Sequence, residues 1–416
     1  MYLPSATYFK FYIVAELMKI DDVSLKIIPD SRGEPTLQAT LKVGNFYFSA
    51  DVPSGKSRGS HEAFVLDPSW ALQKLDAIRE KTLGVECKDQ ASFDGLLLQL
   101  DGTESKKNLG GNTILGLSIA WARAKAKLEG LELYEYIGKL LDTRYELLTA
   151  HIPHPIFNMI EGGAHVGHEK NKLDFQEFQV IPVDADSRGL NADQRRQNDF
   201  AKAFDAGREF YAQLGIVLEE KYGKENVVLG DESGFSAPFQ KNEEALEILD
   251  ALVKKTNGNL KIGLDIAATQ LLDTDGIYTI GQKKYAANGL VSYYFNLTHT
   301  YNIISLEDPF SEEAFDAFAE LKSYFHQMTG VKDFPLIITD DLTTTNQARL
   351  GTAIEKDAGS AIIIKPNQIG TITETIEVAR LAGRAGWRKI VSHRSGDTPD
   401  DFIADLAVGI GAWGIK

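Results

Sequence analysis

Short apolar runs that end in a polar residue recur from residue 155 onward, and most are followed by a segment of helical length. The clearest is AIII at residues 361–364, which leads directly into Lys365 and then a turn. Such a run is typical of a strand buried on both faces. Eight strands close a parallel barrel, and eight runs are present. They are PIFNMIE (155–161), FQEFQVIP (175–182), NVVLG (226–230), LKIGLD (260–265), NIISLE (302–307), PLIITD (335–340), AIIIK (361–365) and RKIVSH (388–393).

The predicted fold class is therefore α/β, with an eight-stranded β/α (TIM-like) barrel over residues 149–416. No helix-length segment separates the first two runs, so we expect them to form an antiparallel hairpin. An open doubly wound sheet is the closest rival, but no Gly-rich dinucleotide turn follows a first strand.

A smaller α+β domain with a lid loop is predicted for residues 18–148. Apolar and polar residues alternate over 24–50, which is typical of an antiparallel meander, and helical spacing follows at 70–99 and 112–128. Residues 1–17 are predicted to be an N-terminal extension. They resemble a secretory signal only weakly, because charged residues interrupt the apolar part and no small-residue cleavage site follows.

The composition is that of a globular protein with a large core. The chain has 416 residues, 43% of them hydrophobic, and one cysteine, Cys87, which excludes an internal disulfide framework. A net charge of -15 argues against nucleic-acid and membrane partners. No run is apolar enough to span a bilayer. We expect a cytoplasmic protein, and a cell-surface or secreted location without a signal peptide stays open.

The strand ends carry the chemistry, because the carboxyl ends of barrel strands converge on one face. Acids clustered there repel one another unless a cation lies among them. Asp265, Glu307 and Asp340 come from three successive strands and form an all-oxygen set suited to Mg²⁺. The residues expected at this mouth are Glu177, Glu232, Asp265, Glu307, Asp340, Lys365 and His393.

A polar segment rich in Gly and Ser, SGKSRGSHE at residues 54–62, lies between the meander and the first helical segment. Its Gly-Lys-Ser resembles the end of a phosphate-binding P-loop, but Ala50 stands where that motif requires its first glycine. The segment is instead predicted to be a mobile lid.

Several segments together resemble the enolases, the phosphopyruvate hydratases of glycolysis, over roughly residues 18–416. The resemblance implies reversible dehydration of the small molecule 2-phosphoglycerate to phosphoenolpyruvate, with Mg²⁺ as the cofactor. The segments are SGKSRGSHEA, FNMIEGGAH, QEFQVIP, GDESGF, GLDIAAT, LEDPF, TDDLTTTN, IIIKPNQIGTITE and SHRSGDTPDDFIADLAVG.

The resemblance also implies catalytic roles. Lys365 is the implied base that removes the C2 proton, and Glu232 is the implied general acid that protonates the leaving 3-hydroxyl. Glu177 and His165 are implied to assist Glu232. Lys365 has to be neutral to accept a proton, and we expect nearby metal cations and partial burial to lower its pKa.

Asp265, Glu307 and Asp340 match the ligands of a first Mg²⁺. Ser57, in the lid, matches a serine that helps hold a second Mg²⁺ once substrate is bound. The remaining matches are substrate contacts, with Arg394 and Ser395 at the phosphate and Lys416 at the carboxylate. The full substrate-binding set is Gln176, His393, Arg394, Ser395 and Lys416.

Enolases continue beyond the position of Lys416, so this chain is expected to lack the family's C-terminal end. A terminal carboxylate at Lys416 would lie near an anionic substrate, which is unfavourable. A folded but inactive enolase-like scaffold is therefore an alternative, and a related lyase for acid sugars or amino acids is another. Enolases are usually homodimers through the N-terminal module, so we expect a homodimer.

Overall fold

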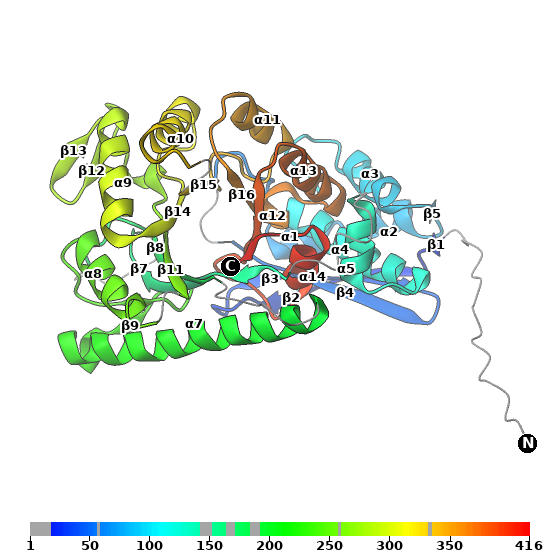
Figure 1. Ribbon diagram of the computed structural model, residues 1–416. Coiled ribbons are helices and arrows are strands. Elements are labelled where there is room, and N and C mark those ends of the chain that lie inside the picture. The colour runs from blue at the N-terminus through cyan, green and yellow to red at the C-terminus, as the bar shows by residue number, and fades with distance from the viewer. Residues whose placement is uncertain are drawn as a thin grey trace, which may run out of the picture.

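The computed structural model describes residues 18–55, 59–141, 152–163, 171–183, 192–256, 259–331 and 335–416. The expected extension at residues 1–17 lies outside this set. Figure 1 shows the N-terminal strands and helices on one side of the molecule and the barrel strands on the other, with the C-terminus near the centre.

The N-terminal part contains the predicted antiparallel meander. It consists of β2 (Asp22–Pro29), β3 (Pro35–Val43) and β4 (Phe46–Val52). Alternate residues of β3 are buried from Leu37 to Val43, as the two-residue period predicts. A short additional pair joins β1 (Met18–Lys19) to β5 (Glu86–Cys87).

Five helices follow the meander in the described residues, and the stretch expected to be helical over 70–99 overlaps three of them. The break falls where Gly84 adopts a left-handed backbone (φ 72°) and Asp89 caps a new helix. Gly116 allows close packing of a helix on the sheet, since a Cβ there would lie 2.8 Å from that of Ala39. The helices are α1 (Pro68–Leu72), α2 (Leu75–Thr82), α3 (Gln90–Asp101), α4 (Gly111–Glu129) and α5 (Leu133–Leu140).

Eight strands of the described chain close a barrel, counting the first as one strand interrupted at Ile156. Its two halves pair with opposite ends of the sheet: β6 with β18, and β7 with β8. The hairpin of β7 and β8 is antiparallel, as expected, and every pair from β11 to β18 is parallel. The strands are β6 (His154–Pro155), β7 (Phe157–Glu161), β8 (Glu177–Pro182), β11 (Leu260–Asp265), β14 (Ile303–Glu307), β15 (Leu336–Thr339), β16 (Ala361–Ile364), β17 (Arg388–Val391) and β18 (Gly414–Ile415).

One of the eight runs expected to form a barrel strand does not form one. The NVVLG run forms only β9 (Val228–Leu229), which makes a hairpin with β10 (Phe235–Ser236) beside β7. Leu229 is 56% exposed, so the run is not a doubly buried strand. The eighth barrel strand is β18, whose two residues are too short for a periodic signal.

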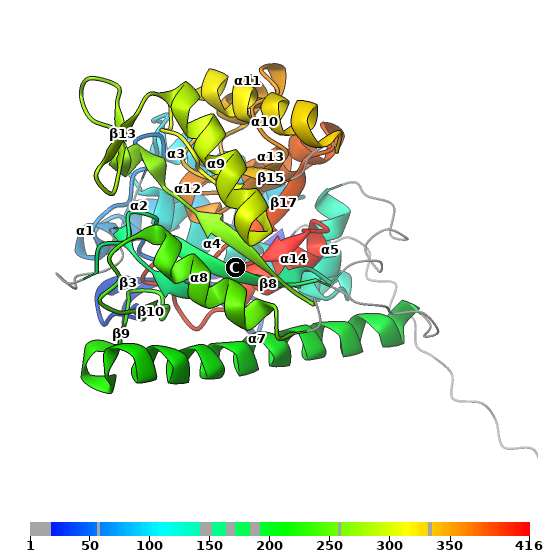
Figure 2. The ribbon, with the colours of Figure 1, turned by 60° about the vertical axis from the view of Figure 1, so that its left-hand side comes forward.

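Helices surround the barrel strands (Figure 1). The longest, α7 (Ala192–Tyr222), runs along one side of the molecule in both ribbon views (Figures 1 and 2). The small elements η2 (Lys224–Asn226), η3 (Ala268–Leu271), β12 (Tyr278–Ile280) and β13 (Lys283–Tyr285) lie in the connections. The other helices are α8 (Asn242–Val253), α9 (Ala287–Tyr301), α10 (Phe315–Thr329), α11 (Gln347–Glu355), α12 (Pro366–Ile369), α13 (Ile372–Arg384) and α14 (Phe402–Gly409).

The N-terminal sheet is bound to the loop that follows β17. Backbone hydrogen bonds join Ser54 to Gly396 (3.0 Å) and Ser31 to Asp397 (2.8 Å). Arg123 of α4 adds two hydrogen bonds to the Asp400 carboxylate, at 2.7 and 2.8 Å. These contacts hold the start of the lid segment against the mouth of the barrel.

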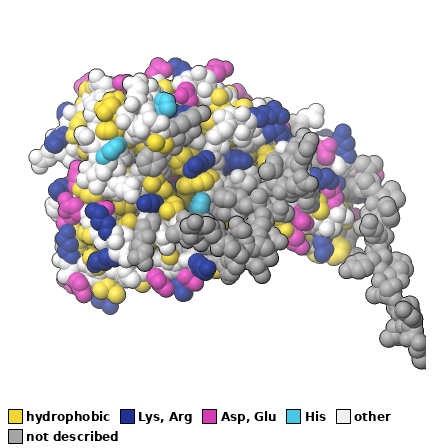
Figure 3. Space-filling model, in the orientation of Figure 1, with side chains coloured by type: hydrophobic (Ala, Val, Ile, Leu, Met, Phe, Trp, Pro, Cys, Tyr) yellow, Lys and Arg dark blue, Asp and Glu magenta, His cyan; other side chains and the backbone are white. Residues whose placement is uncertain are grey.

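Acidic and basic side chains are interspersed on the face drawn in Figure 3. None of the helices in the described part of the chain combines the length and apolar character needed to cross a membrane.

Candidate active site

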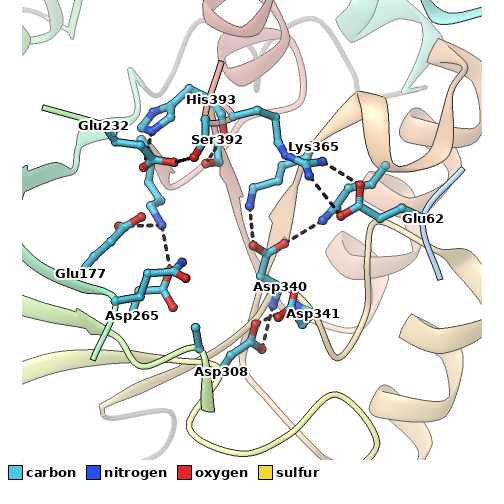
Figure 4. Close-up of a pocket in the computed structure, with 16 residues that line it drawn as sticks. Glu62, Glu177, Glu232, Asp265, Asp308, Asp340, Asp341, Lys365, Ser392 and His393 are labelled. Carbon is cyan, nitrogen blue, oxygen red and sulfur yellow. Dashed lines mark hydrogen bonds and ion pairs between the residues drawn. The ribbon is translucent and has the colours of Figure 1, made fainter. Parts of the chain in front are cut away.

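The carboxyl ends of the barrel strands surround a polar pocket (Figure 4). Its walls also include Glu62, from the segment after β4. The lining residues are Glu62, Gln176, Glu177, Glu232, Asp265, Ala267, Asp308, Asp340, Asp341, Lys365, Gln368, Ser392, His393, Arg394, Ser395 and Lys416.

Lys416, directly after β18, extends its ammonium group into a group of three buried carboxylates. Its Nζ lies 3.0 Å from Glu177, 3.2 Å from Glu307 and 3.5 Å from Asp265. Burial disfavours the ammonium, but the three acids outweigh that cost and raise the pKa of Lys416 well above its ordinary value. The three acids therefore favour the charged form of Lys416.

Lys365, directly after β16, forms an ion pair with Asp340. Its backbone N–H donates to Thr345 Oγ1 at 2.9 Å, and Gln368 donates to the other Asp340 oxygen at 3.0 Å. Burial lowers the pKa of Lys365, but the Asp340 carboxylate outweighs burial and raises it. This direction is opposite to the sequence-based expectation, which assumed a bound metal.

A second group of acids lies behind Lys365. Asp308, Asp340 and Asp341 each place one carboxylate oxygen within 4.8 Å of the others. Asp308 accepts the backbone N–H groups of Asp340 (3.1 Å) and Asp341 (2.7 Å). Burial and the adjacent Asp340 raise the pKa of Asp341 to about 7.

Glu232 lies across the pocket from Lys365 (Figure 4), on the turn between β9 and β10. Its carboxylate accepts hydrogen bonds from His393 Nε2 at 2.9 Å and Ser395 Oγ at 2.6 Å. Burial lowers the pKa of His393, but the hydrogen bond to Glu232 outweighs burial and raises it. Glu232 and His393 therefore form a hydrogen-bonded pair.

Arg394 contacts the segment that follows β4. Its Nη1 and Nη2 donate to the two Glu62 oxygens at 2.9 and 3.2 Å, and Nη1 also donates to Asn367 at 3.0 Å. Glu62 in turn accepts the Gly59 N–H at 2.9 Å. The guanidinium therefore couples the loop after β17 to the predicted lid.

The structure brings together eleven of the thirteen residues proposed from sequence, counting Glu307 through its contact with Lys416. Gln176 is among them, with its Nε2 3.4 Å from Asp265. The other two, Ser57 and His165, lie outside the described residues.

Sequence reasoning missed Glu62, Asp308, Gln368 and Glu161. Glu161 ends the first apolar run, so the strand-end rule that selected the other acids could have found it. Its carboxyl group is fully buried and accepts the Glu232 and Gly234 backbone N–H groups, at 3.1 and 2.6 Å. Burial raises the pKa of Glu161 to about 8, although these hydrogen bonds oppose the shift.

The donor chemistry fits a hard divalent cation. Burial and mutual repulsion raise the pKa values of Asp265, Glu307 and Asp308. An excess of buried negative charge on oxygen ligands is what Mg²⁺ or a similar ion relieves. The three acids expected as ligands are divided here between two lysines, with Asp265 and Glu307 beside Lys416 and Asp340 beside Lys365.

These features define a class of protein: a two-part barrel enzyme whose mouth combines a lysine, a facing carboxyl group and buried oxygen ligands for a metal. Two family models match the chain, "Enolase, N-terminal domain" over residues 20–137 and "Enolase, C-terminal TIM barrel domain" over residues 149–416. The chain belongs to the enolase family.

Curated enolases from three archaea are similar to this chain. Those of Methanococcoides burtonii, Methanocaldococcus jannaschii and Pyrococcus furiosus are 40%, 39% and 39% identical, over 95%, 96% and 96% of this chain. The matches cover 90%, 91% and 90% of the relatives. They do not favour the inactive scaffold. The chain is a lyase that dehydrates 2-phosphoglycerate to phosphoenolpyruvate, and the family implies a metal cofactor.

Proposed function

We propose that this pocket dehydrates 2-phosphoglycerate with Lys365 as the base and Glu232 as the acid. The main support for this proposal is that Lys365 and Glu232 lie on opposite sides of one pocket, with carboxylates between them (Figure 4). Lys365 takes the C2 proton, the electron pair of that C–H bond forms the C2=C3 double bond, and the C3–O bond breaks. Glu232, in its protonated form at the start of the step, gives its proton to the departing hydroxyl, which leaves as water.

We propose Mg²⁺ as the cofactor, with Asp265, Glu307 and Asp340 as ligands of the first ion and Ser57 as a contact of the second. Ions held by these residues would supply positive charge that stabilises the negative charge developing when the C2 proton is removed. Neutralising Asp340 would also remove the interaction that raises the pKa of Lys365.

The other side chains are proposed to hold the substrate. Arg394 and Ser395 bind the phosphate, since a guanidinium fork matches phosphate oxygens. Lys416 binds the substrate carboxylate, and Gln176 and His393 supply further contacts. This arrangement favours a phosphorylated substrate over the acid sugars and amino acids of related lyases.

Glu177 and His165 are proposed to assist Glu232. The contact between Glu177 and Lys416 at 3.0 Å supports a place for Glu177 in the same charge network as Glu232, which also raises the pKa of Lys416. Replacing His165 with Ala tests the second assignment.

The decisive experiment separates the two chemical steps. Exchange of the C2 hydrogen with solvent deuterium measures the proton removal proposed for Lys365. Formation of phosphoenolpyruvate, followed by ultraviolet absorbance, depends on both Lys365 and Glu232. We expect Glu232→Gln to retain exchange while product formation falls about 10²- to 10³-fold. Wild-type product should require Mg²⁺ and disappear with chelator.

The matched control is Lys389→Met, which removes a partly buried lysine of β17 whose Nζ donates to the Ile410 carbonyl oxygen. It should retain both activities. Equal losses of exchange and product formation in Glu232→Gln would contradict its role as the acid.

The proposed context is a cytoplasmic homodimer that joins through the N-terminal domain, with domain boundaries after residues 17 and 148. The family-model ranges 20–137 and 149–416 support these boundaries. Light scattering of the purified chain measures the oligomeric state, and a monomer at micromolar concentration would contradict the dimer.

A further inference from the structure

Glu161 is a buried carboxyl group next to the catalytic pocket, but outside the set of residues that line it. It ends β7, opposite Glu177 on β8, and its side chain is fully buried. Its carboxyl group accepts two hydrogen bonds from the turn after β9, and the donors are the backbone N–H groups of Glu232 and Gly234. Glu161 therefore contacts the main chain that carries the proposed acid.

The turn encloses this carboxyl group closely. A Cβ at Gly230 would lie 2.0 Å from Glu161 Oε2, and one at Gly234 would lie 2.8 Å from Glu161 Cγ. Only glycine allows both backbone segments to approach this far. The size of the Glu161 side chain and the two glycines thus determine the path of the turn.

The conformation of the turn also needs support. Ser233 has a left-handed backbone (φ 66°), which is costly for a residue other than glycine. The turn is closed by the Gly230 N–H, which donates to the Gly234 carbonyl at 2.9 Å, and the Tyr211 hydroxyl donates to the Ser233 carbonyl at 2.6 Å. The hydrogen bonds that Glu161 accepts from the Glu232 and Gly234 N–H groups are two further contacts to the same turn.

This turn places Glu232 against the loop that follows β17. The Glu232 carboxylate is held by His393 and Ser395, whereas its backbone is held by Glu161. Loss of the backbone anchor would let the carboxyl group move relative to the leaving hydroxyl. A displacement of about 1 Å is enough to reduce a proton transfer by about 100-fold.

We propose that Glu161 is the positioning residue of the dehydration step, and that it holds the turn so that the Glu232 carboxyl group faces the departing hydroxyl. The inference rests on the proposed role of Glu232. Glu161 has two functions in this proposal. It accepts hydrogen bonds from the N–H groups of the turn, and it fills the space left by Gly230 and Gly234. It does not contact the substrate, so it acts through Glu232.

The proposal predicts that Glu161 affects one chemical step and not the other. In Glu161→Ala, product formation should fall about 30-fold, while exchange of the C2 hydrogen should change by less than about threefold. A side chain with only a general structural role would lower both rates together, because both require the same pocket and the same metal.

Glu161→Gln is the conservative variant, since its amide oxygen can accept the same two N–H groups at nearly the same size. It should retain product formation within about threefold of the wild-type rate. Asp405→Asn, on α14, is the matched control for replacing a partly buried carboxyl group whose pKa is raised, and it should leave both rates unchanged.

The outcomes separate the two proposals. If Glu232→Gln loses product formation selectively but Glu161→Ala retains it, the positioning role of Glu161 is wrong. If Glu161→Ala loses both rates equally while circular dichroism shows a folded chain, the role is also wrong. If Glu232→Gln itself retains product formation, the assignment of the acid fails first.

Discussion

Lys365 and Lys416 are two largely buried lysines at one mouth, and they differ in how many carboxylates surround them. Lys365 forms an ion pair with Asp340, whereas Lys416 lies among Glu177, Asp265 and Glu307. Both pKa values are raised, that of Lys365 chiefly by Asp340 and that of Lys416 by Glu177, Glu307 and Asp265 together. Neutralising one acid would remove the main support for the charge of Lys365 and leave Lys416 charged.

The comparison explains why chemically identical side chains suit different tasks. A base must be able to lose its proton near neutral pH, and a lysine supported by one carboxylate is closer to that condition. A group that binds an anionic substrate should keep its charge, as a lysine among three acids does. The number of neighbouring carboxylates thus supports Lys365 as the base and Lys416 as the carboxylate contact.

The largest expected effect comes from exchanging each lysine for the uncharged, similarly long methionine. Lys365→Met should lower both C2 exchange and product formation by about 10³- to 10⁴-fold, because it removes the proposed base. Lys416→Met should mainly raise KM, by about 30-fold, through loss of a charge-assisted contact. Steady-state kinetics and deuterium exchange measure both. The comparison breaks if Lys416→Met abolishes exchange and Lys365→Met does not.

The next largest effect is on Mg²⁺ affinity, and it tests which of the two groups of acids, that beside Lys416 or that beside Lys365, binds the ion. Asp265→Asn, beside Lys416, should weaken Mg²⁺ binding by about 100-fold in calorimetry because it removes an oxygen of a proposed ligand. Asp341→Asn, which removes a member of the acidic group behind Lys365, should weaken it by about tenfold or less. The reverse order would place the ion in the group formed by Asp308, Asp340 and Asp341.

The smallest effect concerns Glu161, a buried acid that contrasts with those paired to the two lysines. Its pKa of about 8 in the folded chain exceeds the ordinary value of 4.5, so the folded state holds a proton that the unfolded state releases. The free energy of unfolding should therefore fall as pH rises from about 5 to 8, with a maximal slope of about 1.4 kcal/mol per pH unit from this group.

Urea denaturation at several pH values measures that slope. Glu161→Gln should remove this contribution, whereas Asp405→Asn should leave it in place. Tyr211, Glu177 and Glu232 are the ionisable groups that interact with Glu161, and their presence in both chains makes the difference between variants the informative quantity. Identical slopes in wild type and Glu161→Gln would contradict the raised pKa.

The sequence by itself determined the barrel class and most of the pocket. Apolar runs of strand length report burial on both faces, and the residue after each run lies at the carboxyl end of a strand. Asp265, Glu307, Asp340, Lys365 and His393 were found in this way because both signals are local. The meander over residues 24–50 could be predicted equally well, from the two-residue period of its apolar residues.

Tertiary structure alone decided which strands close the barrel and which partners each side chain has. The sequence pattern could not show that the last strand, and not the NVVLG run, belongs to the barrel. The strands that form there are only two residues long, which is too short for a periodic signal. The contact between Glu62 and Arg394 joins residues 332 positions apart, and that between Glu161 and the Gly234 N–H spans 73. Such pairs depend on how the chain packs after its strands form, so no local pattern reports them.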